Sequence, residues 1–325
     1  MATQPAKRRW IVAVTAPVLL VLAFFAGPVH RIDETVMPAR VPSEPAALES
    51  YLAAAERRHP DIVPGAEKTI VWAHADRRKT PLAIVYLHGF SASRQEVAPL
   101  CDELGARLGA NVFYARLAGH GRDPRAMGEV QGNEWLQDAT EALAIGREIG
   151  ERVVLVGTST GGTLALWLAQ HDPQKIAALV LISPNLGPRG AGAELLAGPW
   201  GAQVLRAVVG TEHRWDPANP AQARYWNWQY PSTALLPMMA LVKIVRESPL
   251  ESITTPTLVL YSLEDQVVEP LETERAFARL GSRTKRLQVV NDSADRSNHV
   301  LAGDILAARD TARVRDWIVD FLEPL

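Results

Sequence analysis

The sequence contains a single cysteine, Cys101, among its 325 residues. One cysteine excludes an internal disulfide and a cysteine-rich zinc site. Cys101 falls in a segment that we expect to be helical, where a thiol more often contributes packing than catalysis. Cysteine content therefore leaves the redox compartment of the protein open.

The chain also lacks a strong excess of either charge. Charged residues make up 22% of it and the formal net charge is −2. No basic stripe with interleaved aromatic residues stands out, so we expect no general attraction to nucleic acid or acidic lipid. No paired His/Asp cluster has metal-ligand spacing, so we expect no metal. Apart from Gly157–Gly161, no glycine-rich loop that could hold a phosphate is present, so we expect no cofactor.

One long uncharged run is present at the amino terminus. Residues 10–29 follow Lys7-Arg8-Arg9 and contain no charged residue. A run of about 18 or more apolar residues is long enough to span a membrane. The preceding positive charges favour a cytoplasmic amino end, which places the body of the protein in the periplasm or outside the cell. We interpret residues 1–29 as an uncleaved signal-anchor.

The alternative is a cleaved secretory signal, after which the protein would be secreted. A small-x-small cleavage site is poor here, because Phe24 stands two places before Ala26. Residues 30–66 are rich in proline and are interpreted as a linker, with a helical piece at residues 46–58.

The rest of the chain alternates strand and helix patterns. After a short strand at 67–74, buried strands are predicted at residues 81–87, 111–117, 153–156, 177–183, 257–261 and 285–290. Helices are predicted at residues 94–108, 133–150 (capped by Asn133), 269–280 and 307–322. This alternation predicts an α/β fold with a mostly parallel sheet and helices on both faces. Its core comprises residues 67–185 and 254–325.

The alternation is interrupted between residues 186 and 253. This stretch has no convincing strand and is rich in large side chains, among them Trp200, Trp215, Tyr225, Trp226, Trp228, Tyr230, Met238 and Met239. We interpret it as a mostly helical cap inserted over the strand edge. Most of these side chains would form the core of the cap itself, and some would roof a pocket for an apolar acyl or alcohol group.

The most specific motif is Gly157-x-Ser159-x-Gly161, which lies between a valine-rich strand and an apolar helix. A strand that turns sharply into a helix exposes the turn residue at the carboxyl edge of the sheet. The two backbones come close there, so small residues are needed on either side of the serine. This is the nucleophile elbow, and Ser159 is the candidate nucleophile.

A serine hydroxyl needs a base and a group that orients the base. After Ser159, the loop following strand 257–261 offers Asp265 and the loop following strand 285–290 offers His299. The order serine, acid, histidine is the one expected for this fold. We predict His299 as the base and Asp265 as its acid, with Glu264 as the next candidate. Other carboxylates nearby are Glu269, Asp292 and Asp295.

The oxyanion of a tetrahedral intermediate needs preorganised N–H donors. We predict the backbone N–H of Thr160, at the start of the helix after Ser159, and that of Phe90, in the loop after strand 81–87. His88, in the same loop, is interpreted as structural, because it would compete with His299 for one role.

These motifs together resemble the α/β-hydrolase superfamily. His88-Gly89-Phe90, Gly119-His120-Gly121, the elbow, Leu263-Glu264-Asp265 and Asn298-His299 occur in the expected order. They are similar to the branch that contains monoacylglycerol lipases, carboxylesterases and serine aminopeptidases. The resemblance implies an eight-stranded sheet, a cap after the sixth strand, the triad Ser159, Asp265 and His299, and a supporting role for the Gly119–Gly121 loop.

The expected function is therefore that of a serine hydrolase, an esterase or lipase acting on an acyl ester or a lipid-like substrate. The same triad also supports acyl transfer, amide or peptide cleavage and perhydrolysis. A membrane-tethered binding module without activity is a further alternative, although no triad residue is missing. Chain length of the acyl group, oligomeric state and the pocket-lining cap residues are left open by the sequence.

Overall fold

The computed structural model describes residues 22–190 and 192–325. Its centre is a seven-stranded sheet with the order β1-β3-β2-β4-β5-β8-β9. The strands are β1 (Thr69–Val71), β2 (Thr80–Leu87), β3 (Asn111–Tyr114), β4 (Gly150–Thr158), β5 (Ile176–Ile182), β8 (Thr257–Tyr261) and β9 (Lys285–Val289). Only β1 is antiparallel to its neighbour, and the other pairs are parallel. The prediction of a mostly parallel sheet is confirmed.

The number of strands differs from the eight that the resemblance implies. A single three-residue strand, β1, precedes β2, and residues 72–79 between them form bends and turns. The cap consequently follows the fifth main-sheet strand along the chain. β1 itself lies within the short strand that the sequence predicts at residues 67–74.

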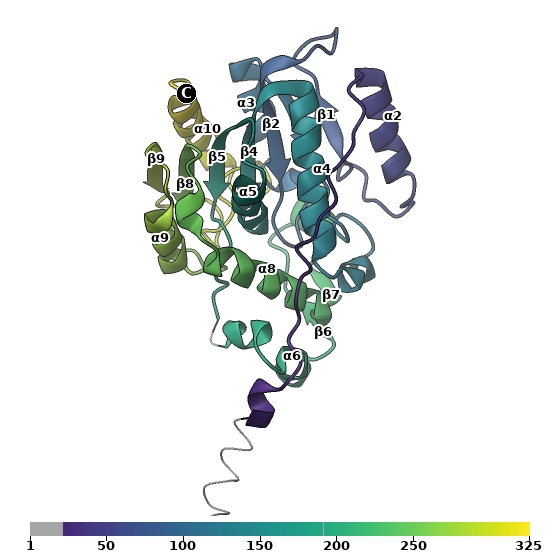
Figure 1. Ribbon diagram of the computed structural model, residues 1–325, viewed down its shortest axis with the longest axis vertical. Coiled ribbons are helices and arrows are strands. Elements are labelled where there is room, and N and C mark those ends of the chain that lie inside the picture. The colour runs from purple at the N-terminus through teal and green to yellow at the C-terminus, as the bar shows by residue number, and fades with distance from the viewer. Residues whose placement is uncertain (1–21, 191) are drawn as a thin grey trace, which may run out of the picture.

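Helices cover both faces of the sheet (Figure 1). Successive side chains of β2 point to opposite faces, so Ala83, Val85 and Leu87 join one apolar cluster while Ile84 and Tyr86 join another. The first cluster is completed mainly by α2 (Pro45–Glu56), α4 (Asn133–Ile149), α5 (Thr160–His171), α8 (Leu235–Glu247) and α9 (Pro270–Arg279). The second is completed by α3 (Leu100–Leu108) and α10 (Ala308–Leu322).

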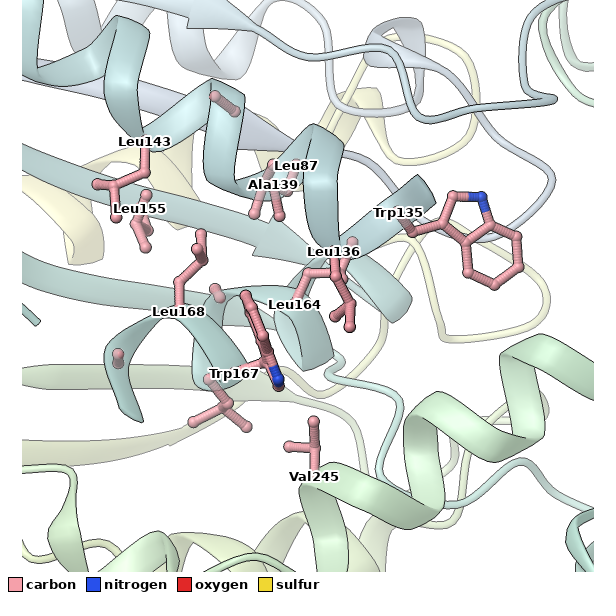
Figure 2. Packing of buried hydrophobic residues seen from close by; sticks show 14 of the residues in the cluster. Leu87, Trp135, Leu136, Ala139, Leu143, Leu155, Leu164, Trp167, Leu168 and Val245 are labelled. Atoms are coloured by element: carbon pink, nitrogen blue, oxygen red, sulfur yellow. The ribbon is translucent and has the colours of Figure 1, made fainter. Parts of the chain in front are cut away.

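The helix that carries the elbow is buried on nearly every side. Figure 2 shows Leu164, Trp167 and Leu168 of α5 packed among side chains of α4, β4 and α8. Ten of the twelve residues of α5, Thr160 to Ala169, are buried. A buried leucine contributes about 1.5–3 kcal/mol relative to an exposed one. This packing holds α5, and with it the end of β4, in one position.

One predicted helix start and one predicted helix cap are wrong. Residues 94–108 form a short 3₁₀ turn, η1 (Arg94–Glu96), and then α3, which begins only at Leu100. Pro99 intervenes, and a proline disfavours helical backbone in the residue before it. Asn133 does not cap α4: it is the first helical residue, and Gly132 occupies the cap position with positive φ.

The insertion at residues 186–253 contains more than helices. Its elements are η3 (Ala193–Ala197), α6 (Gly201–Val208), β6 (Glu212–Arg214), α7 (Pro220–Tyr225), β7 (Gln229–Pro231), η4 (Ser232–Ala234), α8 and η5 (Leu250–Ser252). β6 and β7 pair antiparallel, from Glu212 with Pro231 to Arg214 with Gln229. The prediction that this stretch has no convincing strand is wrong, because a three-residue strand offers too few alternating positions for its pattern to be distinguished from a loop.

Of the predicted signal-anchor, residues 1–21 lie outside the described part of the chain. None of the helices formed by residues 22–190 and 192–325 is both long and apolar enough to span a bilayer. The first part of the predicted linker, which begins at residue 30, runs along α4 (Figure 1). Met37 N–H donates to Gln137, and the Trp167 indole donates to Glu34. The predicted linker therefore packs on the core.

Candidate active site

Ser159 lies in a strained turn between β4 and α5. Its backbone has φ 52° and ψ −118°, a region that side-chain-bearing residues rarely adopt. The glycines on either side are required by contact. A Cβ on Gly157 would lie 2.5 Å from the Gly161 carbonyl oxygen, and one on Gly161 would lie 1.9 Å from that of Leu87. Strand, loop and helix backbones thus meet at this point, as the glycine spacing predicts.

Hydrogen bonds hold the backbone of Ser159. Its N–H donates to Ile182 of β5 at 2.9 Å, and its carbonyl accepts from Gly162, Thr163 and Asn185 at 2.9, 3.2 and 3.0 Å. The side chain is 7% exposed. Asn185, in the loop after β5, contributes its backbone here. Several hydrogen bonds from neighbouring residues therefore hold this turn in place. Such surroundings allow a strained backbone conformation to persist in a folded protein.

His299 and Asp265 form a buried pair. His299 Nδ1 lies 2.8 Å from Asp265 Oδ2. The other carboxylate oxygen of Asp265 accepts the backbone N–H groups of Val267 and Val268 at 2.7 and 2.9 Å. Both carboxylate oxygens are thus occupied, and the ring orientation follows from the pair. Nδ1 is engaged by Asp265, so Nε2 is the nitrogen left for a substrate or a serine.

The other candidate acids are placed elsewhere. Glu264 is exposed, whereas Asp265 is 1% exposed. Asp295 is buried, but its Oδ2 accepts the backbone N–H groups of His299 and Val300 at 3.0 and 2.9 Å. Asp295 therefore fixes the loop that carries His299 and does not contact the ring by a hydrogen bond.

Three carboxylates influence the pKa of His299. Burial alone would lower it, because burial disfavours the charged imidazolium. The charge and hydrogen bond of Asp265, together with the charges of Glu96 and Asp295, outweigh burial and raise the pKa above its usual value of 6.5. This environment favours the imidazolium that forms when a base takes a proton.

Ser159, Asp265 and His299 follow strands β4, β8 and β9, so they share the carboxyl edge of the sheet. Asp265 and His299 are joined directly. Within residues 22–190 and 192–325, no hydrogen bond joins the Ser159 hydroxyl to the His299 ring. Hydroxyl-to-base hydrogen bonds commonly tighten only when substrate is present.

The loop after β2 lies against the elbow. A Cβ on Gly89 would lie 3.2 Å from the Cβ of Ser159. The next residue is Phe90, and its N–H donates to no acceptor in the described chain. Thr160 begins α5, so its N–H has no partner within the helix. Two N–H groups without protein acceptors thus flank Ser159, as an oxyanion hole requires.

The neighbouring histidines are engaged in structure. His88 is fully buried: Leu117 N–H donates to Nε2 at 3.0 Å, and Nδ1 donates to the Gly89 carbonyl at 2.9 Å. Burial holds the pKa of His88 well below its usual value. Burial likewise lowers the pKa of His120 to about 4. Both rings stay neutral near pH 7, and His88 has no nitrogen free for catalysis.

The cap reaches the site through aromatic contacts. The Phe90 ring meets that of Tyr230, from β7, edge to face at 5.4 Å between centroids. A separate apolar cluster joins Trp226 of the cap to Ala92, in the loop after β2, and to Val300, beside His299. The cap therefore packs on the two loops that carry the predicted oxyanion donor and the predicted base.

Glu96 is a buried carboxyl that the sequence analysis did not identify. It is 2% exposed and accepts hydrogen bonds from the Gly89 N–H and the Tyr86 hydroxyl. In the sequence it falls in a segment predicted as a helix, where a glutamate normally faces solvent. Its burial depends on the 3₁₀ turn η1, which no local pattern indicates.

A mostly parallel sheet with a strand–serine–helix turn, followed along the same edge by an acid and a histidine, defines an α/β hydrolase. Comparison with known proteins narrows this class. A family model described as serine aminopeptidase, S33, matches residues 78–294. The chain belongs to this family, and it is a hydrolase of the branch that includes monoacylglycerol lipases and esterases. The matched span contains Ser159 and Asp265 and ends before His299.

Individual relatives agree with the family. A thermostable monoacylglycerol lipase of Bacillus sp. strain H-257 is 26% identical over 213 residues, which is 66% of this chain and 82% of that protein. A solved structure from work on LipS and LipT, two metagenome-derived lipolytic enzymes, is 24% identical and covers 81% of this chain and 100% of its own, with a TM-score of 0.65. A soluble variant of monoglyceride lipase from Saccharomyces cerevisiae has a TM-score of 0.58 at 14% identity, covering 82% and 98%. The two structures establish the fold.

Proposed function

We propose that this protein hydrolyses carboxylic esters that carry an apolar acyl or alcohol group, through an acyl-enzyme on Ser159. The observation that carries the proposal is the 2.8 Å contact between His299 and Asp265, on the sheet edge that also bears Ser159. The two N–H groups of Phe90 and Thr160 beside Ser159 support it. The nucleophile, the base, the acid that orients the base and the oxyanion donors are thereby each assigned to a residue.

The reaction runs in two halves. The Ser159 oxygen attacks the acyl carbonyl while His299 Nε2 takes the hydroxyl proton, and the carbonyl oxygen becomes an oxyanion held by Phe90 and Thr160. The bond to the alcohol breaks as His299 returns the proton to it. Water then attacks the acyl-serine, losing a proton to His299, and the serine leaves with that proton as the acid is released. Asp265 stabilises the imidazolium throughout.

The test is the variant Ser159→Ala with short p-nitrophenyl esters as substrates. Loss of a nucleophilic serine can cost on the order of 10⁶ in turnover. A fluorophosphonate probe should label the wild type and not the variant. Ser50→Ala is the matched control, because Ser50 is an exposed serine of α2. Retained turnover in Ser159→Ala would sink the proposal, and a wild type that neither turns over esters nor reacts with the probe would indicate a binding module.

Apolar substrates are supported by the cluster of Trp226, Ala92 and Val300. Trp226 is 8% exposed and packs on the residue next to His299, so it excludes water beside the reacting centre. The relative from Bacillus carries the name monoacylglycerol lipase. A panel of monoacylglycerols and p-nitrophenyl esters of graded length, with and without detergent, tests this preference.

The family description favours a second candidate, cleavage of an amide bond next to a free amine. The same three residues would perform it, because the acyl-enzyme is common to both reactions. Aminoacyl p-nitroanilides, measured in parallel with esters of matched size, separate the two. A higher kcat/KM for the anilides would replace the ester proposal. Acyl transfer and perhydrolysis would appear as products formed with added alcohols or peroxide.

We further propose that the amino-terminal segment attaches the protein to a membrane with the hydrolase domain extracytoplasmic. The end of this segment lies on the cap (Figure 1). Trp200 of the cap donates from its indole to the Phe24 carbonyl at 3.0 Å and from its backbone to that of Pro28 at 2.9 Å. Both the segment and the cap expose large apolar side chains: Leu22, Phe24, Phe25, Leu195, Val208 and Val209.

Large apolar side chains exposed in this number are typical of a surface that faces a membrane or a partner. Fractionation of cells that produce the full chain should place it in the membrane pellet, resistant to salt and released by detergent. Removal of residues 1–29 should release it to the soluble fraction. The mass of the mature protein decides between anchor and cleaved signal, because only a cleaved chain lacks the first residues.

A further inference from the structure

A buried carboxyl group lies beneath the loop that carries the Phe90 N–H. Glu96 Oε1 accepts the Gly89 N–H at 2.6 Å and the Tyr86 hydroxyl at 2.6 Å. Both partners belong to the strand β2 or the turn that follows it. The Gly89 N–H is thereby occupied, which leaves the N–H of the next residue, Phe90, as the donor of this loop that can face an oxyanion.

The same carboxyl is connected to the nucleophile strand. The Tyr86 oxygen lies 3.0 Å from the Thr158 hydroxyl. A phenol has one proton, so when Tyr86 donates to Glu96, Thr158 donates to Tyr86. Thr158 directly precedes Ser159. One chain of hydrogen bonds therefore runs from the elbow through Tyr86 to Glu96 and ends at Gly89, and all four residues are buried.

Glu96 is also close to Ser159 in space. A Cβ built on Gly89 would lie 3.1 Å from Glu96 Oε2 and 3.2 Å from the Ser159 Cβ. No side chain larger than hydrogen fits at Gly89 without disturbing this contact. The loop that follows His299 meets the backbone of the same turn: a Cβ on Gly303 would lie 2.4 Å from the Glu96 carbonyl oxygen.

The charge of Glu96 acts on His299. Burial raises the pKa of Glu96 to about 7, against the opposing effects of Tyr86, Gly89 and the positive charge of His299. In turn, ionised Glu96 is one of the three carboxylates that raise the pKa of His299, with Asp265 and Asp295. The buried Cys101 thiol also faces Glu96, and burial keeps its pKa well above its usual value, so it stays neutral.

We propose that Glu96 is a positioning residue for the esterase reaction: it holds the Gly89–Phe90 turn so that the Phe90 N–H faces the oxyanion, and its negative charge stabilises the His299 imidazolium. The inference rests on the proposed function of Ser159, Asp265 and His299. It adds a further carboxylate to the site, on the opposite side of β4 from Asp265 in the strand order, since Glu96 follows β2 and Asp265 follows β8.

Two substitutions separate the two roles. In Glu96→Gln the amide oxygen can still accept from Gly89 and Tyr86, but the charge is lost. The acid limb of the kcat/KM profile should then move to lower pH, because removal of a negative charge lowers the pKa of His299. At high pH the kcat should stay within about tenfold of wild type, since removing a nearby charge costs less than removing an oxyanion donor.

In Glu96→Ala both hydrogen bonds are lost as well. We expect kcat to fall by about 10²–10³, the usual effect of losing an oxyanion donor, while KM changes little. Tyr86→Phe removes one of the two bonds and should give a smaller fall in kcat. It also keeps the inference testable if Glu96→Ala does not fold. Glu103→Gln on α3 is the control, because its carboxylate is partly exposed and pairs with Arg315.

In Glu96→Gln, the acid limb of the kcat/KM profile is expected to shift to lower pH. In Glu96→Ala or Tyr86→Phe, kcat is expected to fall. A Glu96→Gln profile that coincides with wild type overturns the inference, and so does a kcat that neither of the other variants reduces. Ser159→Ala, measured alongside, distinguishes these failures. If it abolishes turnover while the Glu96 variants behave as wild type, the esterase assignment stands and the role of Glu96 falls.

Discussion

The loops at the strand edge and the cap hold their side chains by different means. At the strand edge, buried polar groups bind backbone: Asp265 accepts from Val267 and Val268, and Asp295 accepts from His299 and Val300. The aromatic rings of the cap, such as Trp226 and Tyr230, meet these loops through apolar contacts, beside backbone hydrogen bonds such as that from Asn227 N–H to the Ser91 carbonyl. Directional hydrogen bonds specify one geometry, whereas apolar contacts tolerate substitution of similar volume. Under the proposed function, the reacting groups lie on the edge loops, and the cap is the region in which substrate choice can vary.

The largest expected effect is at the strand edge. Asp265→Asn should lower kcat by about 10⁴, because an amide at this position stabilises neither the right tautomer nor the imidazolium. Turnover of a short p-nitrophenyl ester measures it. Glu264→Gln is the matched control and should leave kcat unchanged, since Glu264 is exposed. Loss of turnover in Glu264→Gln but not in Asp265→Asn would assign the acid to Glu264. The contrast between buried edge groups and the rest of the molecule would then fail.

The next effect is on pH dependence. A base must be unprotonated, so the raised pKa of His299 moves the acid limb of kcat/KM upward, to a midpoint above 6.5. Below the midpoint, activity should fall about tenfold per pH unit. Initial rates across pH measure this, with recovery after return to neutral pH as the control for unfolding. A midpoint below 6.5 would contradict the dominance of Asp265 and its neighbouring carboxylates over burial.

A smaller effect is expected from the cap. Trp226→Ala removes the ring that packs on Ala92 and Val300. We expect KM to rise several-fold for long-chain esters and less for acetate, because an apolar contact contributes about 1–3 kcal/mol to binding. Trp200→Ala is the control, since Trp200 contacts the amino-terminal segment. A loss confined to kcat and equal for all chain lengths would place Trp226 in the catalytic machinery. The cap would then not differ from the strand edge in this respect.

The smallest effect on chemistry should come from the outer face of the cap. Val208 is 79% exposed, so Val208→Ser should leave the hydrolysis of dissolved esters within about twofold, as most surface substitutions do. Binding to neutral lipid vesicles should weaken, because an apolar contact with lipid is lost. Sedimentation of full-length protein with vesicles measures this. Equal binding by the variant would argue against this face as a membrane contact.

The contrast between edge and cap also explains what could be predicted. Ser159 and Asp265 follow strands with clear apolar runs, β4 and β8, and His299 follows the next strand along the chain, β9, so their shared edge could be inferred from chain order. Strand β8 was predicted with the bounds that it has, residues 257–261. Glu96 could not be found this way, because its burial results from the 3₁₀ turn before Pro99 and from contacts with Tyr86 and Gly89.

The cap was the least predictable region for a related reason. β6 and β7 have three residues each, and their pairing joins residues about 17 positions apart, from Glu212–Pro231 to Arg214–Gln229. The role of Trp226 depends on contacts with Ala92 and Val300, which are far away in the sequence. Composition indicates that such a region is buried somewhere, but long-range packing decides which ring meets which loop.

The contact of Trp200 with Phe24 and Pro28 has a practical consequence. Phe24 and Pro28 lie at the cap, whereas α10 and Leu325 lie at the opposite end of the molecule (Figure 1). A fluorophore or affinity tag added at Leu325 would therefore stand away from the cap. Protein immobilised through such a tag would present the cap outward, which suits single-molecule imaging of cap movements or capture of substrate analogues from solution.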